Sequence, residues 1–386
     1  MLAAFLLLAP LLTASPAPGA NTEKIFGQVA QQADAARTAD KTQDAIRLYR
    51  QGVRLRPAWS EGWWSLGSLL YDQDRFLDAD DAFRRYVAVT PKAGPAYAFL
   101  GLCEYETKNY DRALEHFQAW AHQGWPGTPD LIDVAAFHWA LLLTRKGQFV
   151  EGLYLLTIEA SKQRGGPALT EAMGLAALRL PSLPEDYPPS QRELVWLAGK
   201  AAFYASLPSR EFDRADEYAR KLSLHYGHEP NVHYFRGTLF KSEHKSAEAA
   251  LEFQQELKIS PRHAAAMAEL ARLDLDSYQI AEASSLAKQA IAIKPTSSEA
   301  HHVLGEVFFA QQQFQESVKE LEMAKHLAPD VAPLRLHLAR AYKALGRNKD
   351  AEQELATFNL LKKKELVFAS PEEKLNTLRK RAESAK

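Results

Sequence analysis

Two neighbouring histidines, His301 and His302, are of a type and spacing that could do chemistry. Glu306 follows His302 by four residues, and residues four apart lie next to each other on a helix. An imidazole beside a carboxylate can bind a divalent metal or share a proton. Whether these residues bind a metal or share a proton depends on the helix face that each histidine occupies. That face depends in turn on how the surrounding helices are arranged.

The other residues that could bind a metal are less convincing. His225, His228 and His233 form an H-x2-H-x4-H pattern, but no acidic or cysteine ligand completes the set. We interpret His225 and His228 as loop residues and His233 as a residue inside a helix. The single cysteine, Cys103, excludes an intramolecular disulfide and a cysteine-built metal site. It lies in the apolar stretch FLGLCEY, which predicts a small buried hydrophobic residue.

No motif for catalysis occurs in the sequence. H-E-x-x-H, G-x-S-x-G, G-x-x-x-x-G-K-[ST] and G-x-G-x-x-G are all missing. We therefore expect neither an enzyme nor a cofactor. The alternative that stays open is an unrecognised enzymatic site in the least regular part of the chain, residues 165–230.

Charge and composition narrow the class of partner. The 386 residues carry 47 basic and 48 acidic side chains, a formal net charge of -1. Nucleic acids and anionic membrane surfaces attract proteins with a basic excess, so neither is expected as the main partner. A protein or peptide partner fits this balance better, and the composition indicates no particular oligomeric state.

The first twenty residues, MLAAFLLLAPLLTASPAPGA, differ from the rest of the chain. Their apolar run is shorter than the about 20 residues that span a bilayer. Small residues and prolines follow it, as in a secretory signal peptide, although no Lys or Arg precedes it. We predict a signal peptide over residues 1–20, export to the periplasm or the exterior, and no integral membrane span after its removal. A retained membrane anchor is the alternative.

A 34-residue repeat organises most of the chain after this segment. Pro57 and Pro91 are 34 residues apart, and Pro261, Pro295 and Pro329 follow one another at the same interval. Because proline cannot continue a helix, it marks the end of each unit. We number a block from the third residue after such a proline. Positions four, seven, eight and eleven then share one face of a first helix, and small residues at positions eight and twenty let a second helix approach closely.

This pattern resembles the tetratricopeptide repeat family at its W-x2-L-G…A-x3-F…P positions. The matching residues are WWSLG at Trp63–Gly67 with Ala79, Phe83 and Pro91, and YAFLG at Tyr97–Gly101 with Ala113 and Phe117. The resemblance implies an all-α, right-handed superhelical solenoid of about nine stacked helix hairpins.

Departures from the repeat predict the division of the chain. Four prolines in nine residues, within LPSLPEDYPPS, interrupt the helical pattern and predict an elbow near residue 185. We expect an N-terminal array over 24–164, an irregular Pro-rich elbow over 165–191, and a C-terminal array over 192–361. A polar helix or tail occupies 362–386, where SPEE at Ser370–Glu373 is a capping box.

In the resembling family, the second, fifth, ninth and twelfth residues of the first helices line a concave groove that binds peptides. Carried over by position, the candidate groove residues are Trp64, Tyr71, Tyr105, Tyr234, Lys241, Arg272, His302, Phe309, Arg340 and Lys343. Aromatic side chains interleaved with cations could hold an extended peptide by stacking, with the charges setting its register.

The same numbering separates the two histidines. His301 is the fourth residue of its block and is expected to pack between helices. His302 is the fifth and Glu306 the ninth, both expected on the groove side. Because His301 and His302 face different ways, they cannot bind one metal together, and we predict no metal ligands.

Together these patterns predict an exported, non-enzymatic scaffold that binds a protein or peptide in the cell envelope. The alternative function is a structural subunit of an envelope secretion or outer-membrane biogenesis complex.

Overall fold

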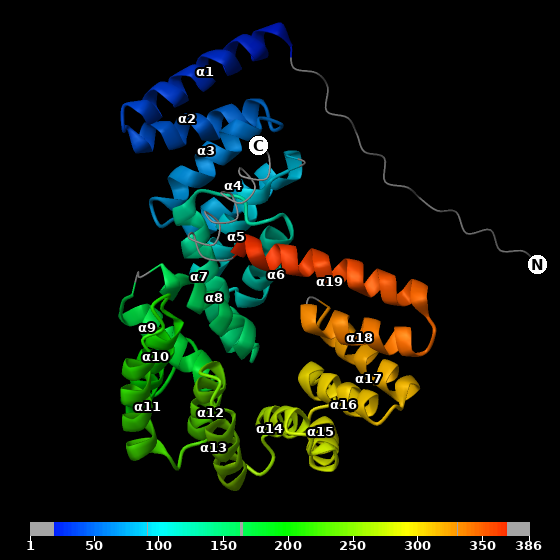
Figure 1. The fold of residues 1–386 in the computed structure, drawn as a ribbon. Coiled ribbons are helices and arrows are strands. Elements are labelled where there is room, and N and C mark those ends of the chain that lie inside the picture. Colours follow the sequence, from blue (N-terminus) through cyan, green and yellow to red (C-terminus); the bar gives the residue numbers. More distant parts are fainter. Residues whose placement is uncertain (1–18, 91, 163–164, 330, 369–386) are drawn as a thin grey trace, which may run out of the picture. The chain divides into compact units, whose positions relative to one another are not determined.

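The protein's structure, a computed structural model, describes residues 19–90, 92–162, 165–329 and 331–368. Within these residues the chain forms nineteen α-helices, which pack pairwise as stacked hairpins (Figure 1). The predicted all-α fold class is confirmed. Residues 1–18 of the expected signal peptide and the SPEE motif at 370–373 lie outside the described residues.

The chain divides into two compact units, Met1–Leu142 and Leu143–Lys386. The division falls inside a helix, upstream of the elbow expected over 165–191. The helices that begin in the first unit are α1 (Ala20–Thr38), α2 (Thr42–Leu55), α3 (Ser60–Tyr71), α4 (Phe76–Val89), α5 (Gly94–Glu106), α6 (Tyr110–His122) and α7 (Pro129–Arg145).

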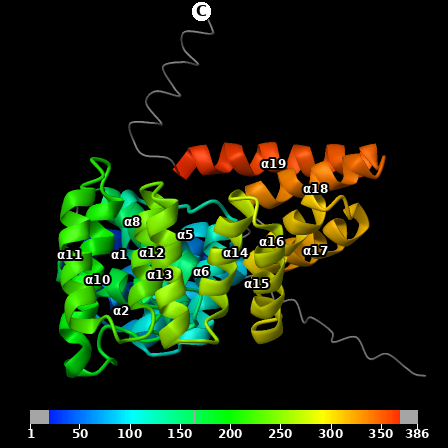
Figure 2. The same cartoon turned by 60° about the horizontal axis from the view of Figure 1, so that its bottom comes forward.

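The second unit holds the remaining helices, and Figure 2 shows α10 to α13 side by side within it. Its helices are α8 (Phe149–Ser161), α9 (Pro167–Ala177), α10 (Arg192–Ser206), α11 (Phe212–Tyr226), α12 (Val232–Ser242), α13 (Ser246–Ile259), α14 (Ala264–Asp276), α15 (Ile280–Ile293), α16 (Ser298–Ala310), α17 (Phe314–Leu327), α18 (Ala332–Ala344) and α19 (Asn348–Phe368), with a short 3-10 helix at Pro189–Gln191. Residues 362–368, at the start of the segment predicted as a polar helix or tail, are helical and continue α19.

A glycine at block position eight lets the helices of a hairpin approach. A Cβ atom added at Gly67 would lie 2.9 Å from the ring of Phe83, at position twenty-four of the same block. Gly237 stands in the same relation to Phe253, at 2.6 Å. The bulky residue therefore fills the space that the missing side chain leaves, and both rings are fully buried.

The turn inside each hairpin contains a residue in the left-handed backbone region. Such residues recur at intervals of 34 in two series, and each lies two residues before the second helix. They are Asp40, Asp74 and Lys108, and then Arg210, His244, Tyr278, Gln312 and Gly346. A residue with positive φ ends the first helix and reverses the chain. The 34-residue repeat thus holds for backbone conformation as well as for sequence.

In three hairpins, the side chain at block position four connects the first helix to the preceding proline. The Trp63 indole N–H donates to the carbonyl of Pro57 at 2.8 Å. The His301 ring Nε2 donates to the carbonyl of Pro295 at 3.0 Å, and the Arg335 guanidinium donates to that of Pro329. His301 is therefore a structural residue, as its position predicts.

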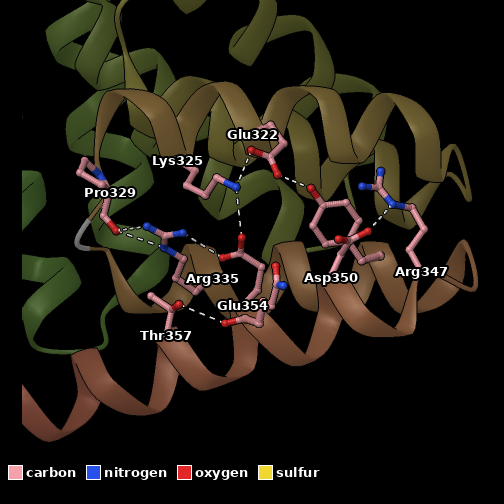
Figure 3. A network of polar contacts seen from close by, with 10 residues as sticks. Glu322, Lys325, Pro329, Arg335, Arg347, Asp350, Glu354 and Thr357 are labelled. Carbon is pink, nitrogen blue, oxygen red and sulfur yellow. Dashed lines mark hydrogen bonds and ion pairs between the residues drawn. The ribbon is translucent and has the colours of Figure 1, made fainter.

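Where position four is a histidine or arginine, in three hairpins, its side chain also pairs with a carboxylate on the second helix of the hairpin. His233 meets Glu252 and His301 meets Glu320, both at 2.6 Å. In the last hairpin, Arg335 donates to Glu354 at 2.9 Å, and Lys325 of α17 reaches the same carboxylate at 3.1 Å (Figure 3). These pairs hold the two helices of a hairpin in register.

The His233–Glu252 pair makes part of the stability depend on pH. The hydrogen bond to Glu252 raises the pKa of His233 above 6.5, against the effect of burial, and the Glu252 charge adds to it. Because the folded-state pKa is raised, this stabilisation is fully present below pH 6.5 and is lost as pH rises through the folded pKa. We expect His233→Gln to cost more stability at pH 6 than at pH 8.5. Urea unfolding of both chains at the two pH values measures this. An equal cost at both would contradict it.

The region expected as an elbow contains a helix as well as irregular chain. Between α9 and the 3-10 helix the chain is irregular, but α9 itself packs very closely on α10. A Cβ atom at Gly174 of α9 would lie 2.0 Å from the Val195 carbonyl oxygen. One at Gly199 of α10 would lie 1.9 Å from that of Thr170. The two helices therefore touch backbone to backbone.

Cys103 is fully buried in the core of the first unit. Burial raises the pKa of its thiol, so the cysteine stays protonated and unreactive. This confirms the prediction of a small buried hydrophobic residue.

Candidate functional site

Two groups of predicted groove residues come together in the structure, one in each unit. The first is a row of aromatic rings on α3 and α5. Trp64 lies 5.6 Å from Phe99, and Tyr71 lies 5.2 Å from the same ring, measured between centroids. Trp64 and Tyr71 are partly exposed. Phe99, which the family's groove positions do not include, joins the two hairpins into one aromatic surface.

A third predicted aromatic residue, Tyr105, lies near the C-terminal end of α5. Its ring contacts Tyr110 at 5.6 Å and His138 of α7 at 4.6 Å, both edge to face. Burial raises the pKa of Tyr71 to about 12, so its hydroxyl remains a hydrogen-bond donor at any physiological pH. The row therefore offers apolar ring surface with hydroxyl groups among it.

Tyr234 does not join that surface, because it is buried in the second unit. Its ring stacks on His263 at 4.8 Å and contacts Phe253 at 5.8 Å. The guanidinium of Arg179 lies 5.1 Å from the ring and donates to the hydroxyl at 3.4 Å. Burial raises the pKa of Tyr234 to about 12. Only 7% of this residue is exposed, which leaves it little surface for a partner.

The remaining candidates are spread along the second unit. Lys241 is exposed and forms an ion pair with Glu269. Phe309 is partly buried against Phe314, 5.4 Å away. Arg340 and Lys343 of α18 are exposed. Three of these four residues therefore present a charged side chain rather than an aromatic ring.

The second group is a compact cluster of charged and polar side chains on α14, α16 and α18. Glu306 Oε1 accepts from Arg272 at 2.5 Å. The same oxygen lies 3.0 Å from His302 Nε2 and 2.8 Å from His337 Nδ1. Burial acts to raise the pKa of Glu306, but the hydrogen bonds from both histidines and the Arg272 charge hold that pKa well below its ordinary value. The carboxylate is therefore ionised at every physiological pH.

Sequence reasoning paired His302 with Glu306 correctly but missed His337 and placed His302 in an open groove. His302 is only 7% exposed, because His337 of the next hairpin covers it with its ring centroid 5.0 Å away. His337 follows His302 by 35 residues, one more than the repeat, so comparison of equal block positions passes over it. The sequence feature that could have indicated His337 is the stretch LRLHLAR, in which this histidine lies between two leucines.

The pattern around His225 gives no comparable cluster. His228 is exposed beside Glu229, and His233 is engaged with Glu252. In the described part of the chain, three potential ligand groups converge at His302, Glu306 and His337. No described helix is long and apolar enough to cross a membrane.

A third feature, outside the predicted groove positions, is a shallow hollow on α2 and the start of α4. Four arginines line it, namely Arg47, Arg50, Arg54 and Arg75. Arg50 and Arg75 both pair with Asp78, and Arg47 pairs with Asp44. The hollow therefore keeps a basic excess.

Comparison with known proteins gives one family match. Residues 31–95 and 65–129 match the profile of the tetratricopeptide repeat. No curated protein matches the sequence. Similar solved structures include MamA 41-end from Desulfovibrio magneticus RS-1, at 17% identity over 45% of this chain and 96% of that chain, with a TM-score of 0.38. A second, described as the crystal structure of MamA, has 14% identity over 43% of this chain and 95% of that chain, with a TM-score of 0.36.

Proposed function

Because residues 31–129 carry tetratricopeptide repeats, we propose that the chain is a non-enzymatic scaffold that binds a protein partner. The proposal rests on the aromatic row of Trp64, Tyr71 and Phe99, which lies within those residues, together with Tyr105 near the end of α5. Repeat arrays of this kind use extended surfaces for binding. Here, first helices from two consecutive hairpins supply one such surface.

The chemistry of the row indicates the kind of segment that it binds. Partly exposed rings give a large apolar contact at a small cost in side-chain entropy, and their hydroxyl groups can bond to a peptide backbone. An extended peptide with apolar or aromatic side chains fits this surface. Binding of this type needs no covalent step, which agrees with a sequence that has no catalytic motif.

The proposed place of action is the cell envelope. The composition of residues 1–20 supports export to the periplasm or the exterior. Detection of the mature chain in a periplasmic or secreted fraction, with its N-terminus sequenced, tests this part of the proposal separately.

Loss of the aromatic row is expected to abolish partner capture. Buried aromatic anchors each contribute about 2 kcal/mol or more at interfaces. Replacement of Trp64, Tyr71 and Tyr105 by alanine should therefore weaken binding by about 100-fold or more. The measurement is affinity capture from a native envelope extract with identification by mass spectrometry, followed by titration of the captured partner.

Two controls accompany this variant. Tyr278→Asn removes a ring that is 89% exposed on a hairpin turn outside the row, and it should leave capture unchanged. Since Trp64 also packs on Phe83 at 5.6 Å, a milder pair, Tyr71→Leu with Tyr105→Leu, tests the row with less damage to the core. Circular dichroism must remain helical in each. Full capture by the folded variants would refute the proposal.

The arginine-lined hollow favours a second candidate, a subunit of an envelope assembly that docks an acidic partner on α2. In that case Arg47→Ala with Arg54→Ala would remove capture, while the aromatic variants retain it. A stoichiometric complex that persists through purification would accompany that outcome.

A further inference from the structure

The geometry of His302, Glu306 and His337 points to a metal-binding site. Three potential ligand atoms converge there from two helices. His302 Nε2 and His337 Nδ1 lie 2.8 Å apart, and each is about as far from Glu306 Oε1, at 3.0 Å and 2.8 Å. The three atoms form a nearly equilateral triangle, in which each atom faces both others.

Hydrogen bonds alone do not satisfy such a triangle. Each imidazole nitrogen carries either one N–H or one lone pair in the ring plane, and an ionised carboxylate carries no proton. If both histidines donate to Glu306, two N–H groups face each other across 2.8 Å. If one donates to the other, the acceptor's lone pair is already used and its nitrogen has no proton for the carboxylate. Every arrangement of protons leaves one side of the triangle repulsive.

A cation at the centre removes this conflict, because all three atoms can then present lone pairs to it. Zinc binds imidazole nitrogen at about 2.0–2.1 Å, which puts tetrahedral ligand atoms about 3.3 Å apart. The present separations need to widen by about 0.3–0.5 Å, comparable with the thermal displacement of about 0.5 Å along one axis in an ordered structure.

We propose that His302, Glu306 and His337 bind one divalent transition-metal ion of the zinc class. Two imidazole nitrogens and one carboxylate oxygen suit Zn²⁺ and Co²⁺, whereas Mg²⁺ and Ca²⁺ prefer oxygen ligands alone. Three protein ligands leave one coordination position for water or for a group of a partner. The ion joins α16 to α18 and so connects two consecutive hairpins.

Arg272 is the group that opposes a cation here, because its guanidinium bonds to the same carboxylate oxygen. It also lies 3.7 Å from Glu299, a second carboxylate on α16. The two carboxylates together exceed the single charge of Arg272. A ligating carboxylate commonly accepts such an outer hydrogen bond, which fixes its orientation. Arg272 is therefore a positioning residue that weakens the site without blocking it.

The test is titration of the full, tag-free chain with Co²⁺ after removal of metals by a chelator. We expect one equivalent to bind with the visible absorption of tetrahedral cobalt, and Zn²⁺ to displace it. The melting temperature should rise by about 3 °C when free Zn²⁺ is 100-fold above its Kd, given the length of the chain. Absence of cobalt absorption and of zinc binding by calorimetry in the wild-type chain would overturn the proposal.

Matched variants locate the ion. His302→Ala and His337→Ala should lose the absorption. His337→Gln, which keeps a polar group beside Glu306, serves if alanine unfolds the chain. His301→Gln is the control, because His301 neighbours His302 in sequence yet contacts Glu320 and Pro295 instead. It should bind metal as the wild type does. Binding that survives in the folded His337→Gln chain would show that the ion lies elsewhere, against the proposal.

Discussion

The free energy of unfolding is expected to fall by about 3 kcal/mol when Gly199 is replaced by alanine. The added Cβ atom would lie 1.9 Å from the carbonyl oxygen of Thr170, a backbone atom that no side-chain rotation can move away. The α9 and α10 helices must therefore separate by more than 1 Å, roughly the gap between this distance and normal contact. Their interdigitated packing is lost along the whole contact.

Gly27→Ala provides the matched control for this substitution. Gly27 lies inside α1, and nothing approaches its Cβ position within 4 Å. Alanine has a higher helix propensity than glycine, so this change should stabilise the chain by about 0.5–1 kcal/mol. Urea unfolding followed by circular dichroism measures both. A Gly199→Ala chain within 0.5 kcal/mol of the wild type, roughly the spread of neutral surface changes, would contradict the close contact.

Glu256→Ala is expected to cost about 2–4 kcal/mol, for a different reason. Glu256 is fully buried near the end of α13, and its carboxylate accepts the backbone N–H groups of Asn231 and Tyr234 at 2.9 and 3.2 Å. Those two N–H groups lie at the N-terminus of α12, where backbone donors have no partner within their own helix. Alanine leaves both unsatisfied and opens a cavity.

The cost of this change extends to the next hairpin. The Asn231 side-chain oxygen accepts from His263 Nε2 at 2.8 Å, and His263 Nδ1 accepts the Ala266 N–H that starts α14. Glu256 thus supports the first helices of two hairpins. Chemical denaturation of Glu256→Ala beside Gln254→Ala, an exposed change on the same helix, isolates the effect. Equal stability of the two variants would count against this role.

The parts of the fold that repeat were predictable from sequence. Gly67 and Phe83, Gly237 and Phe253 occupy fixed block positions, and a helix hairpin follows from their spacing alone. His301 was assigned to packing for the same reason. Each of these depends on contacts within one block, where sequence distance and spatial distance are tied by helix geometry.

The parts that lie between blocks were not predictable in the same way. Tyr234 and His302 stand at a groove position in the resembling family, yet His263 and His337 of the following hairpins cover them. Whether a groove position is open depends on the size and register of the neighbouring first helix. A single sequence does not determine that register to within one residue.

The chain could be made more stable at the turn residues that have a positive φ. In the two 34-residue series only Gly346 is a glycine, and Asp40, Tyr278 and Gln312 are among those that carry a side chain at positive φ. Residues such as Tyr278 and Gln312 are strained there, because mainly Gly, Asn and Asp adopt this conformation readily, and glycine would gain about 0.5–1 kcal/mol after its larger chain entropy is counted. Because the turns lie in separate hairpins, the gains should add. These turns therefore hold a reserve of stability that lies in several separate hairpins instead of in one core.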